Sequence, residues 1–316
     1  MMQYRYNLFF RSSFNLLDSI KLSGGLASAA FKLYPEHSEK LERALLNCEL
    51  QVSDQFPIVL DTNECLFPSP ILPYTMPRHE VGGENKSNST DRKKSIAFSS
   101  LKNIMDVMAE FKRGGITKER SIEILENING KDISGLSYYR ANSEYAVSLQ
   151  EQVPRVYVRE LSTAGNIGRR NLRGKELLTF DPIYFIAKYS LSEFSVAMDY
   201  IEDAGFSGMI SRGKGHFIYG RVNSDLKTDF SGEGYYLIIS KYCPSEDDFN
   251  SIDLERSYYA VSTFAGISAD NTGLPKIRYF EPGSILFLKG EIKGKAISTH
   301  SGKRILNFSA LKVKVG

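Results

Sequence analysis

Gly205–Phe217 reads Gly-Phe-Ser-Gly-Met-Ile-Ser-Arg-Gly-Lys-Gly-His-Phe and separates a helix pattern from a strand pattern. Four glycines, one arginine, one lysine and one histidine fall within these thirteen residues. Glycine lets a backbone adopt positive φ and approach a ligand closely, and interleaved cationic side chains can meet a phosphate chain. The segment therefore indicates a loop that holds a polyanion, with an ordinary glycine-rich turn as the alternative.

Part of this loop, Gly208–Lys214, fits the Gly-x-x-x-x-Gly-Lys of a P-loop, but Gly215 stands where a P-loop has Ser or Thr. The preceding segment, Ser192–Ile201, repeats apolar residues at helix spacing. The following segment, His216–Val222, is rich in aromatic and β-branched residues and predicts a strand. A P-loop follows a strand and opens a helix, so the helix–loop–strand order argues against an NTPase.

Composition indicates a globular protein with no membrane segment. The chain has 316 residues, 42% hydrophobic residues and a net charge of +3, so any basic surface must be local. The three cysteines, Cys48, Cys65 and Cys243, form no Cys-x-x-Cys pair and suit a reducing cytoplasm. No apolar run approaches the length of a membrane span, and the N-terminus alternates like a strand rather than a signal peptide. We expect a cytoplasmic protein.

Residues 1–150 mix strand and helix patterns and are predicted to form a first domain. Residues 79–95 are polar and read as a flexible insertion, and 98–127 read as helical with a break at Gly114-Gly115. The other predictions are an N-terminal strand with Tyr4, Tyr6, Leu8 and Phe10 on one face, a small-residue helix at Leu22–Ala30 entered through a glycine turn, a helix at Ser38–Asn47, a broken strand at Val52–Val59 and a proline-punctuated loop at Phe67–Tyr74.

Residues 151–316 are predicted to form a second domain dominated by strands. Only one clear long helix, Ser192–Asp203, lies among the strand candidates Val156–Arg159, Leu177–Tyr189, His216–Val222, Gly234–Tyr242, Ser257–Phe264, Ser284–Ile292 and Leu306–Val315. Many strands with few helices indicate an α+β protein rather than a doubly wound sheet. The simplest arrangement is two β-α-β-β-type units, that is, two ferredoxin-like (RRM-like) domains.

The most basic segment of the chain is residues 155–175, which contain six Arg or Lys residues and one acid. Glycines and asparagines make it loop-like, so it reads as a basic loop suited to an RNA backbone, or else as a solvated surface loop. Catalytic patterns are weak, because the four histidines lie far apart and no metal-ligand spacing occurs. We therefore expect no metal and no cofactor.

Several landmarks follow one another in a fixed order along the chain. They are the Ser23-Gly24-Gly25 segment, Ser53-Asp54-Gln55-Phe56-Pro57, Phe67-Pro68-Ser69-Pro70, Val158-Arg159-Glu160-Leu161-Ser162-Thr163, the glycine-rich loop and Glu281-Pro282-Gly283-Ser284. This series resembles the RAMP superfamily of CRISPR-Cas proteins, in particular subunit four of the type III-A Csm complex. The chain departs from that pattern at Ser207, where the family has glycine, and at Ile210, where it has a basic residue; Arg212 offers a replacement charge.

The resemblance implies a non-catalytic, RNA-binding subunit of a type III effector ribonucleoprotein in antiviral defence. Such a subunit holds the repeat-derived 5′ handle of the CRISPR RNA (crRNA) and contacts a large polymerase-nuclease subunit and a backbone RAMP subunit. The expected RNA-binding residues are Ser23, Gly24, Gly25, Arg155, Arg159, Arg169, Arg170, Gly205, Gly208, Ser211, Arg212, Gly213, Lys214, Gly215 and His216.

Two other functions stay open at the level of sequence. The first is a metal-independent endoribonuclease that processes precursor CRISPR RNA, with His216 as acid–base group and Lys214 stabilising the transition state. The second is a small-molecule nucleotide binder that uses the partial P-loop.

Overall fold

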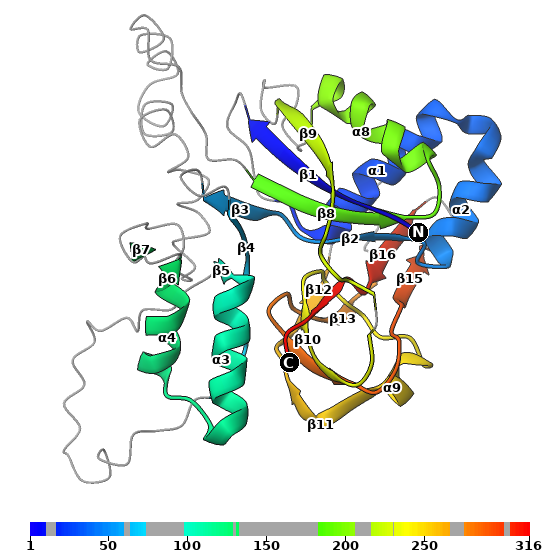
Figure 1. Cartoon of the computed structure of the whole chain (residues 1–316). Helices are drawn as coiled ribbons and strands as arrows, with labels where there is room; N and C mark the ends of the chain where they lie inside the picture. The colour runs from blue at the N-terminus through cyan, green and yellow to red at the C-terminus, as the bar shows by residue number, and fades with distance from the viewer. Residues whose placement is uncertain are drawn as a thin grey trace, which may run out of the picture.

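The computed structural model describes residues 1–10, 17–59, 64–73, 98–128, 131–132, 183–205, 216–229, 231–265, 275–299 and 304–316. Antiparallel sheets and helices make up this part of the chain, which confirms the predicted α+β class (Figure 1). None of the helices described is both long enough and apolar enough to cross a membrane.

A seven-stranded antiparallel sheet combines strands from residues 2–100 with two strands from residues 183–223. Its order is β5-β4-β3-β8-β1-β9, and β2 also pairs with β8. The strands are β1 (Met2–Phe10), β2 (Leu50–Val52), β3 (Phe56–Val59), β4 (Glu64–Pro68), β5 (Phe98–Ser100), β8 (Ile183–Tyr189) and β9 (Phe217–Asn223). The predicted boundary between residues 150 and 151 lies outside the described residues, but strands on either side of it pair within this one sheet.

Helices α1 (Ser19–Leu33) and α8 (Glu193–Ala204) cover one face of this sheet, beside η1 (Pro35–His37) and α2 (Ser38–Leu46). The predicted helices at 38–47 and 192–203 are confirmed within a residue. The glycine turn predicted at the start of α1 is wrong. Asp18 caps the helix by accepting a hydrogen bond from the Lys21 amide at 2.9 Å, so the helix already runs at Gly24 and Gly25.

The alternating residues Tyr4, Tyr6 and Leu8 of β1 lie on one face of the strand, as predicted. Tyr6 and Leu8 are buried against Leu22 of α1 and Phe194 of α8, and Tyr4 packs at the edge of the same cluster. The predicted break in the segment after residue 98 is also confirmed. Helix α3 (Leu101–Gly114) ends before Gly115, whose φ is +90°, and α4 (Lys118–Glu126) follows.

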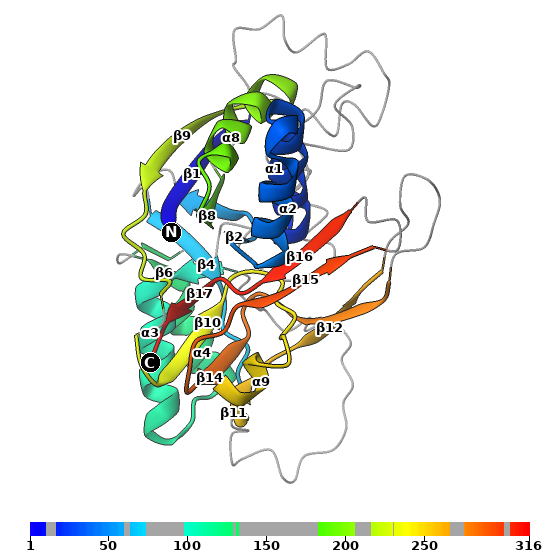
Figure 2. The ribbon, with the colours of Figure 1, turned by 90° about the vertical axis from the view of Figure 1, so that its right-hand side faces the viewer.

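A second, four-stranded sheet packs against the opposite face of the first, with α3 beside them (Figure 2). Tyr184 and Ile186 of β8 share one buried cluster with Leu237, Ile285 and Val313 of the second sheet. In the described residues after 230, the four-residue α9 is the sole helix. The elements of this part are β10 (Gly234–Ile238), α9 (Asp248–Ser251), β11 (Ile252–Tyr258), β12 (Val261–Phe264), β13 (Ile277–Phe280), β14 (Ile285–Leu288), β15 (Gly294–Ser298), β16 (Ile305–Ser309) and β17 (Lys312–Lys314).

Most predicted strands of the second half have counterparts, although they are shorter and more numerous than expected. Two corrections concern the loops. Phe67 and Pro68, predicted to open a loop, belong to β4, where Phe67 is buried beside Tyr184. The two-residue strands β6 (Asn127–Ile128) and β7 (Lys131–Asp132) form a small hairpin that the sequence did not indicate. The predicted insertion at 79–95 and the basic segment 155–175 lie outside the described residues.

Candidate nucleic-acid interface

The ends of the glycine-rich segment and the start of α1 meet at one end of the first sheet. Phe217 pairs with Phe10, the last residue of β1, so His216 lies at that end of the strand. Helix α8 follows Tyr189, which pairs with Met2 at the opposite end, and it runs back along the sheet toward the end where β1 finishes (Figure 1). The fold therefore brings residues separated by almost 200 positions to one edge.

Gly205 closes α8 in a conformation that favours glycine. Its φ is +83° and its ψ is 159°, and its N–H donates to the carbonyl oxygen of Ile201 at 2.8 Å. Only glycine adopts this backbone region without strain. The positive φ that the sequence pattern predicts is thus present where the loop leaves the helix.

His216 marks the point where the chain returns to the sheet. Its side chain is half-buried, and the next residue, Phe217, is buried in the core between the helices and β1. The buried phenylalanine fixes the position of the histidine at the sheet end. The helix–loop–strand order predicted around this loop is confirmed at both flanks, by α8 before it and by β9 after it.

The three predicted residues on α1 differ in what they can offer an RNA. The Ser23 side chain is buried, and its hydroxyl donates to the Ile20 carbonyl at 3.1 Å. Gly24 is exposed, and an added Cβ would meet nothing within 4 Å. Gly25 is half-buried. The helix therefore offers open space at Gly24 for close approach rather than a hydroxyl.

The remaining predicted residues lie outside the described part of the chain. They are Arg155, Arg159, Arg169, Arg170, Gly208, Ser211, Arg212, Gly213, Lys214 and Gly215.

A further cationic residue near this edge, Arg221 of β9, lies over a tyrosine ring. The sequence patterns did not indicate it. The Arg221 guanidinium of β9 lies 5.1 Å from the ring centre of Tyr4 and donates to the Ser195 hydroxyl of α8. Arg221 is exposed on an edge strand, where a cation over an aromatic ring can meet a phosphate. Finding it required the register that pairs Arg221 with Tyr6, which no local pattern supplies.

Two tyrosines near Arg221, Tyr6 and Tyr219, are held in their neutral form. Tyr6 and Tyr189 join their hydroxyl groups at 2.8 Å. Burial raises the pKa of Tyr6 far above its usual range, and the hydrogen bond with Tyr189 raises it further. Burial and the hydrogen bond to Asp199 likewise raise the pKa of Tyr219. These rings therefore provide an uncharged aromatic support for the cation at neutral pH.

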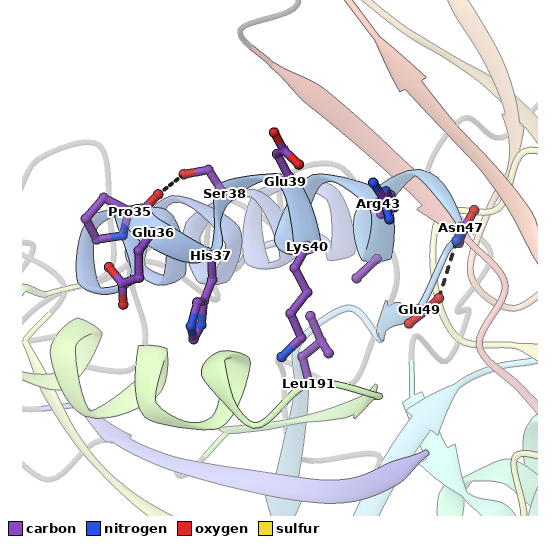
Figure 3. A pocket seen from close by; sticks show the side chains of 11 residues that line it. Pro35, Glu36, His37, Ser38, Glu39, Lys40, Arg43, Asn47, Glu49 and Leu191 are labelled. Atoms are coloured by element: carbon purple, nitrogen blue, oxygen red, sulfur yellow. Dashed lines mark hydrogen bonds between the residues drawn. The ribbon is translucent and has the colours of Figure 1, made fainter.

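A second site lies at the other end of α8, in a cavity of about 670 Å³ beside η1 and α2. In Figure 3, His37 and Lys40 both point from these helices toward α8. There the Glu193 carboxylate, which is 7% exposed, accepts hydrogen bonds from Lys40 Nζ at 2.8 Å and from His37 Nδ1 at 3.0 Å. The Tyr34 ring stacks on His37 with a centre separation of 5.7 Å.

In this cluster the negative charge of Glu193 is compensated by protein groups, Lys40 and His37. Burial raises the pKa of Glu193, but the hydrogen bond and charge of Lys40 and the hydrogen bond of His37 outweigh it and lower the pKa to about 2. The carboxylate is thus ionised at all physiological pH values and already bonded to protein donors. The partners lie 153 and 156 positions from Glu193, so sequence spacing gave no indication of the cluster.

Metal ligation has no support in the residues that the structure describes, since no group of three or more His, Cys, Asp or Glu side chains is placed to hold an ion. His37 and Glu193, although adjacent, are joined by Lys40 rather than by a third ligand.

The sequence matches no protein-family model and no curated protein. The fold, in contrast, is similar over nearly its whole length to that of a chain from a CRISPR-Cas interference complex. That chain comes from a crystal structure of the Csm3–Csm4 subcomplex of the type III-A complex, with 15% identity, a TM-score of 0.55 and coverage of 98% of this chain and 99% of that one.

Two other solved structures show lower similarity. A chain in the crystal structure of a Csm1–Csm4 cassette in complex with one ATP has 12% identity and a TM-score of 0.47, with 99% of this chain and 98% of that one covered. A chain in a type III-B Cmr-beta complex bound to cognate target RNA and AMPPnP has 11% identity and a TM-score of 0.41, with 90% and 86% covered. The similarity to the Csm3–Csm4 structure confirms, at the level of the fold, the resemblance predicted from the sequence.

Proposed function

We propose that this protein is a non-catalytic, RNA-binding subunit of a type III CRISPR effector complex that holds the repeat-derived 5′ handle of the crRNA. The observation that carries the proposal is the fold similarity to a chain of the Csm3–Csm4 subcomplex, which spans 98% of this chain and 99% of that one. The ordered sequence landmarks support the same assignment.

The proposal includes two ferredoxin-like units. Support for the first is topological: the antiparallel order β9-β1-β8-β3, with α1 following β1 and α8 following β8, is that of a β-α-β-β-α-β unit. The second unit rests on the family resemblance together with the four-stranded antiparallel sheet of β11, β14, β10 and β17, which lies within residues 234–314.

In this proposal the RNA backbone lies across the sheet end defined by Gly205, His216 and the exposed Gly24. The loop glycines allow close approach, and Ser211, Arg212 and Lys214 supply donors to phosphates. Exposed bases of an unpaired handle stack or hydrogen-bond along the same surface. Arg221, on its tyrosine support, adds a cation at the edge of β9.

The basic segment is assigned to the same RNA. Arg155, Arg159, Arg169 and Arg170 would form a thumb-like extension that neutralises further phosphates.

Assembly with other subunits in the cytoplasm completes the proposal. Occurrence of a similar fold in a Csm3–Csm4 subcomplex supports docking to a backbone subunit. Docking to a large polymerase-nuclease subunit follows from the resemblance. Cleavage and signalling would belong to these partners, so this chain needs no cofactor or metal of its own.

Co-purification tests the proposed function. The tagged chain, co-expressed with the products of neighbouring genes and a CRISPR array, is expected to isolate with effector subunits and with RNA that begins with a repeat-derived handle. Recovery of the chain alone, or of RNA without enrichment of handle sequences, contradicts the proposal.

A companion experiment separates the proposal from the endoribonuclease alternative. The purified chain is incubated with repeat RNA in EDTA, and we expect binding without cleavage. A single cut within the repeat that is lost in His216→Ala would instead assign the chain to RNA processing.

A further inference from the structure

A second cavity lies between the two sheets, far from the candidate RNA edge. It has a volume of about 660 Å³ and joins the end of α2 and β8 of the first layer to α9 and β17 of the second. Figure 1 shows the N-terminus, β2 and β15 converging in this region. The volume falls in the range of small-molecule sites, about 300–1,000 Å³.

Lys312 of β17 lines this cavity, although the residue is almost completely buried. The residue is only 4% exposed. In the part of the chain that the structure describes, no hydrogen-bond acceptor or carboxylate lies within bonding distance of its amine. A buried lysine with no acceptor is rare, because burying an unpaired charge is costly. The amine is therefore free to react with a molecule that enters the cavity.

The nearest ionic groups do not neutralise this amine. Lys188, 9% exposed on β8, is bonded instead to Asp229. Asp248, which is buried, accepts hydrogen bonds from the Tyr242 hydroxyl at 3.0 Å and from the amides of Lys293 and Gly294 at 2.9 Å each. Asp229 and Asp248, two of the three carboxylates whose charges act on the Lys312 amine, are thus committed to other groups; the third, Glu291, raises the pKa of that amine the most.

The charges around the cavity disfavour an anionic ligand. Besides the lysines, five carboxylates line it, so a phosphate would meet repulsion as well as attraction. The ionisable side chains of the cavity lining are Cys48, Glu49, Lys188, Asp229, Asp247, Asp248, Glu291, Lys293 and Lys312. A small neutral molecule enters this mixture of charges without that repulsion.

We infer that Lys312 Nζ is a nucleophilic amine that takes small, neutral aldehydes from this cavity as imines. The neutral amine attacks the carbonyl carbon, and a carbinolamine forms. The carbinolamine then loses water, so the carbonyl oxygen leaves with the two amine protons and a C=N bond remains. No oxidant or reductant is required.

The electrostatics support this chemistry. Burial lowers the pKa of Lys312 to about 8, the charge of Lys188 lowers it as well, and Glu291, Asp229 and Asp248 oppose the change. Lysines activated by desolvation or by a neighbouring cation are the usual imine-forming residues. At pH 8 about half of such amines are neutral, compared with well under 1% for a lysine of ordinary pKa, about 10.4.

Reductive labelling of the folded wild-type chain tests the inference. The protein is treated with propanal and cyanoborohydride at pH 8 for a short time, and propylated lysines are quantified by peptide mass spectrometry. We expect Lys312 to be labelled at least about tenfold faster than Lys314, its neighbour on β17 whose amine donates to the Ser231 carbonyl at 3.1 Å.

Two variants change the rate in opposite directions without touching the amine. Glu291→Gln removes a charge that raises the Lys312 pKa, so labelling at pH 7.5 becomes faster. Lys188→Met removes a charge that lowers it, so labelling becomes slower. Labelling of Lys312 no faster than Lys314 in the native chain, or a rate that both variants leave unchanged, overturns the inference. Because the wild-type protein gives the main result, a misfolded variant cannot decide it.

Discussion

The two ends of helix α8 differ in how their charged residues are partnered. At its N-terminal end a buried carboxylate, Glu193, is surrounded by Lys40 and His37 from a neighbouring helical segment, and every charge has a protein partner. At its C-terminal end the helix stops at Gly205 in a glycine-only conformation and opens into a segment of glycines and cations. Twelve residues, about 18 Å of helix, separate the two ends.

This difference suggests that one end of α8 contributes to folding stability and the other to RNA binding. The Glu193 end ties α2 to α8 and uses its charges internally, so it has little to offer a ligand. The Gly205 end leads into the glycine-rich segment, whose arginine and lysine we propose to meet a phosphate chain. Changes at the first end are therefore expected to alter folding, and changes at the second to alter RNA affinity.

The largest effect is expected at the Glu193 end in acid. The folded pKa of Glu193, about 2, lies below its ordinary value of 4.5, so its contribution is complete above about pH 4.5 and is lost as the pH falls toward 2. Lys40 and His37 are 55% and 43% exposed, so solvent screens the cluster and we expect a loss of about 2 kcal/mol. Urea unfolding at pH 2–7 measures it.

Glu193→Gln provides the control for this prediction. The variant should be less stable than the wild type by about 2 kcal/mol at pH 7, and the difference should shrink as the pH approaches 2. RNA affinity at pH 7 should not change. A stability difference that is independent of pH would contradict the proposed compensation.

A smaller effect is expected at the Gly205 end. Gly205→Ala forces a side chain into a backbone region that only glycine occupies easily, which should cost about 1–2 kcal/mol of unfolding free energy. Gly24→Ala is the matched change, since its Cβ would meet no neighbour within 4 Å and alanine favours a helix interior by up to about 1 kcal/mol. Thermal or urea unfolding should show opposite signs, and equal stabilities would contradict the assigned role of Gly205.

Local patterns predicted the elements of this comparison well. The apolar spacing of residues 192–201 gave α8, the alternation around Tyr6 gave β1, and the Gly114-Gly115 pair gave the break between α3 and α4. In each case the signal is the periodicity of apolar residues, or a glycine, within a single short segment that forms one element. The resemblance to subunit four of the type III-A complex followed from the order of such segments and agrees with the fold.

Properties that depend on pairing between distant segments could not be predicted. Glu193 and His37 are 156 positions apart, and only the packing of α8 against η1 and α2 brings them together. Arg221 meets Tyr4 through strand register, and Ser23 is buried in a helix that begins three residues before the predicted start at Leu22. Sequence spacing carries no information about these contacts.

We propose that RNA binds at the Gly205 end of α8 through the cations of the glycine-rich segment, Arg212 and Lys214. The most direct measurement is the salt dependence of binding to a repeat-derived single-stranded RNA for Arg212→Ala, Lys214→Ala and the control Lys289→Ala, whose exposed lysine pairs with Asp253 on the second sheet. We predict a loss of affinity of about threefold to tenfold for each loop variant, with a slope of log K against log salt that is shallower by about 0.7, and no change for the control. Unchanged affinity and slope in both loop variants, or an equal loss in Lys289→Ala, would contradict the claim.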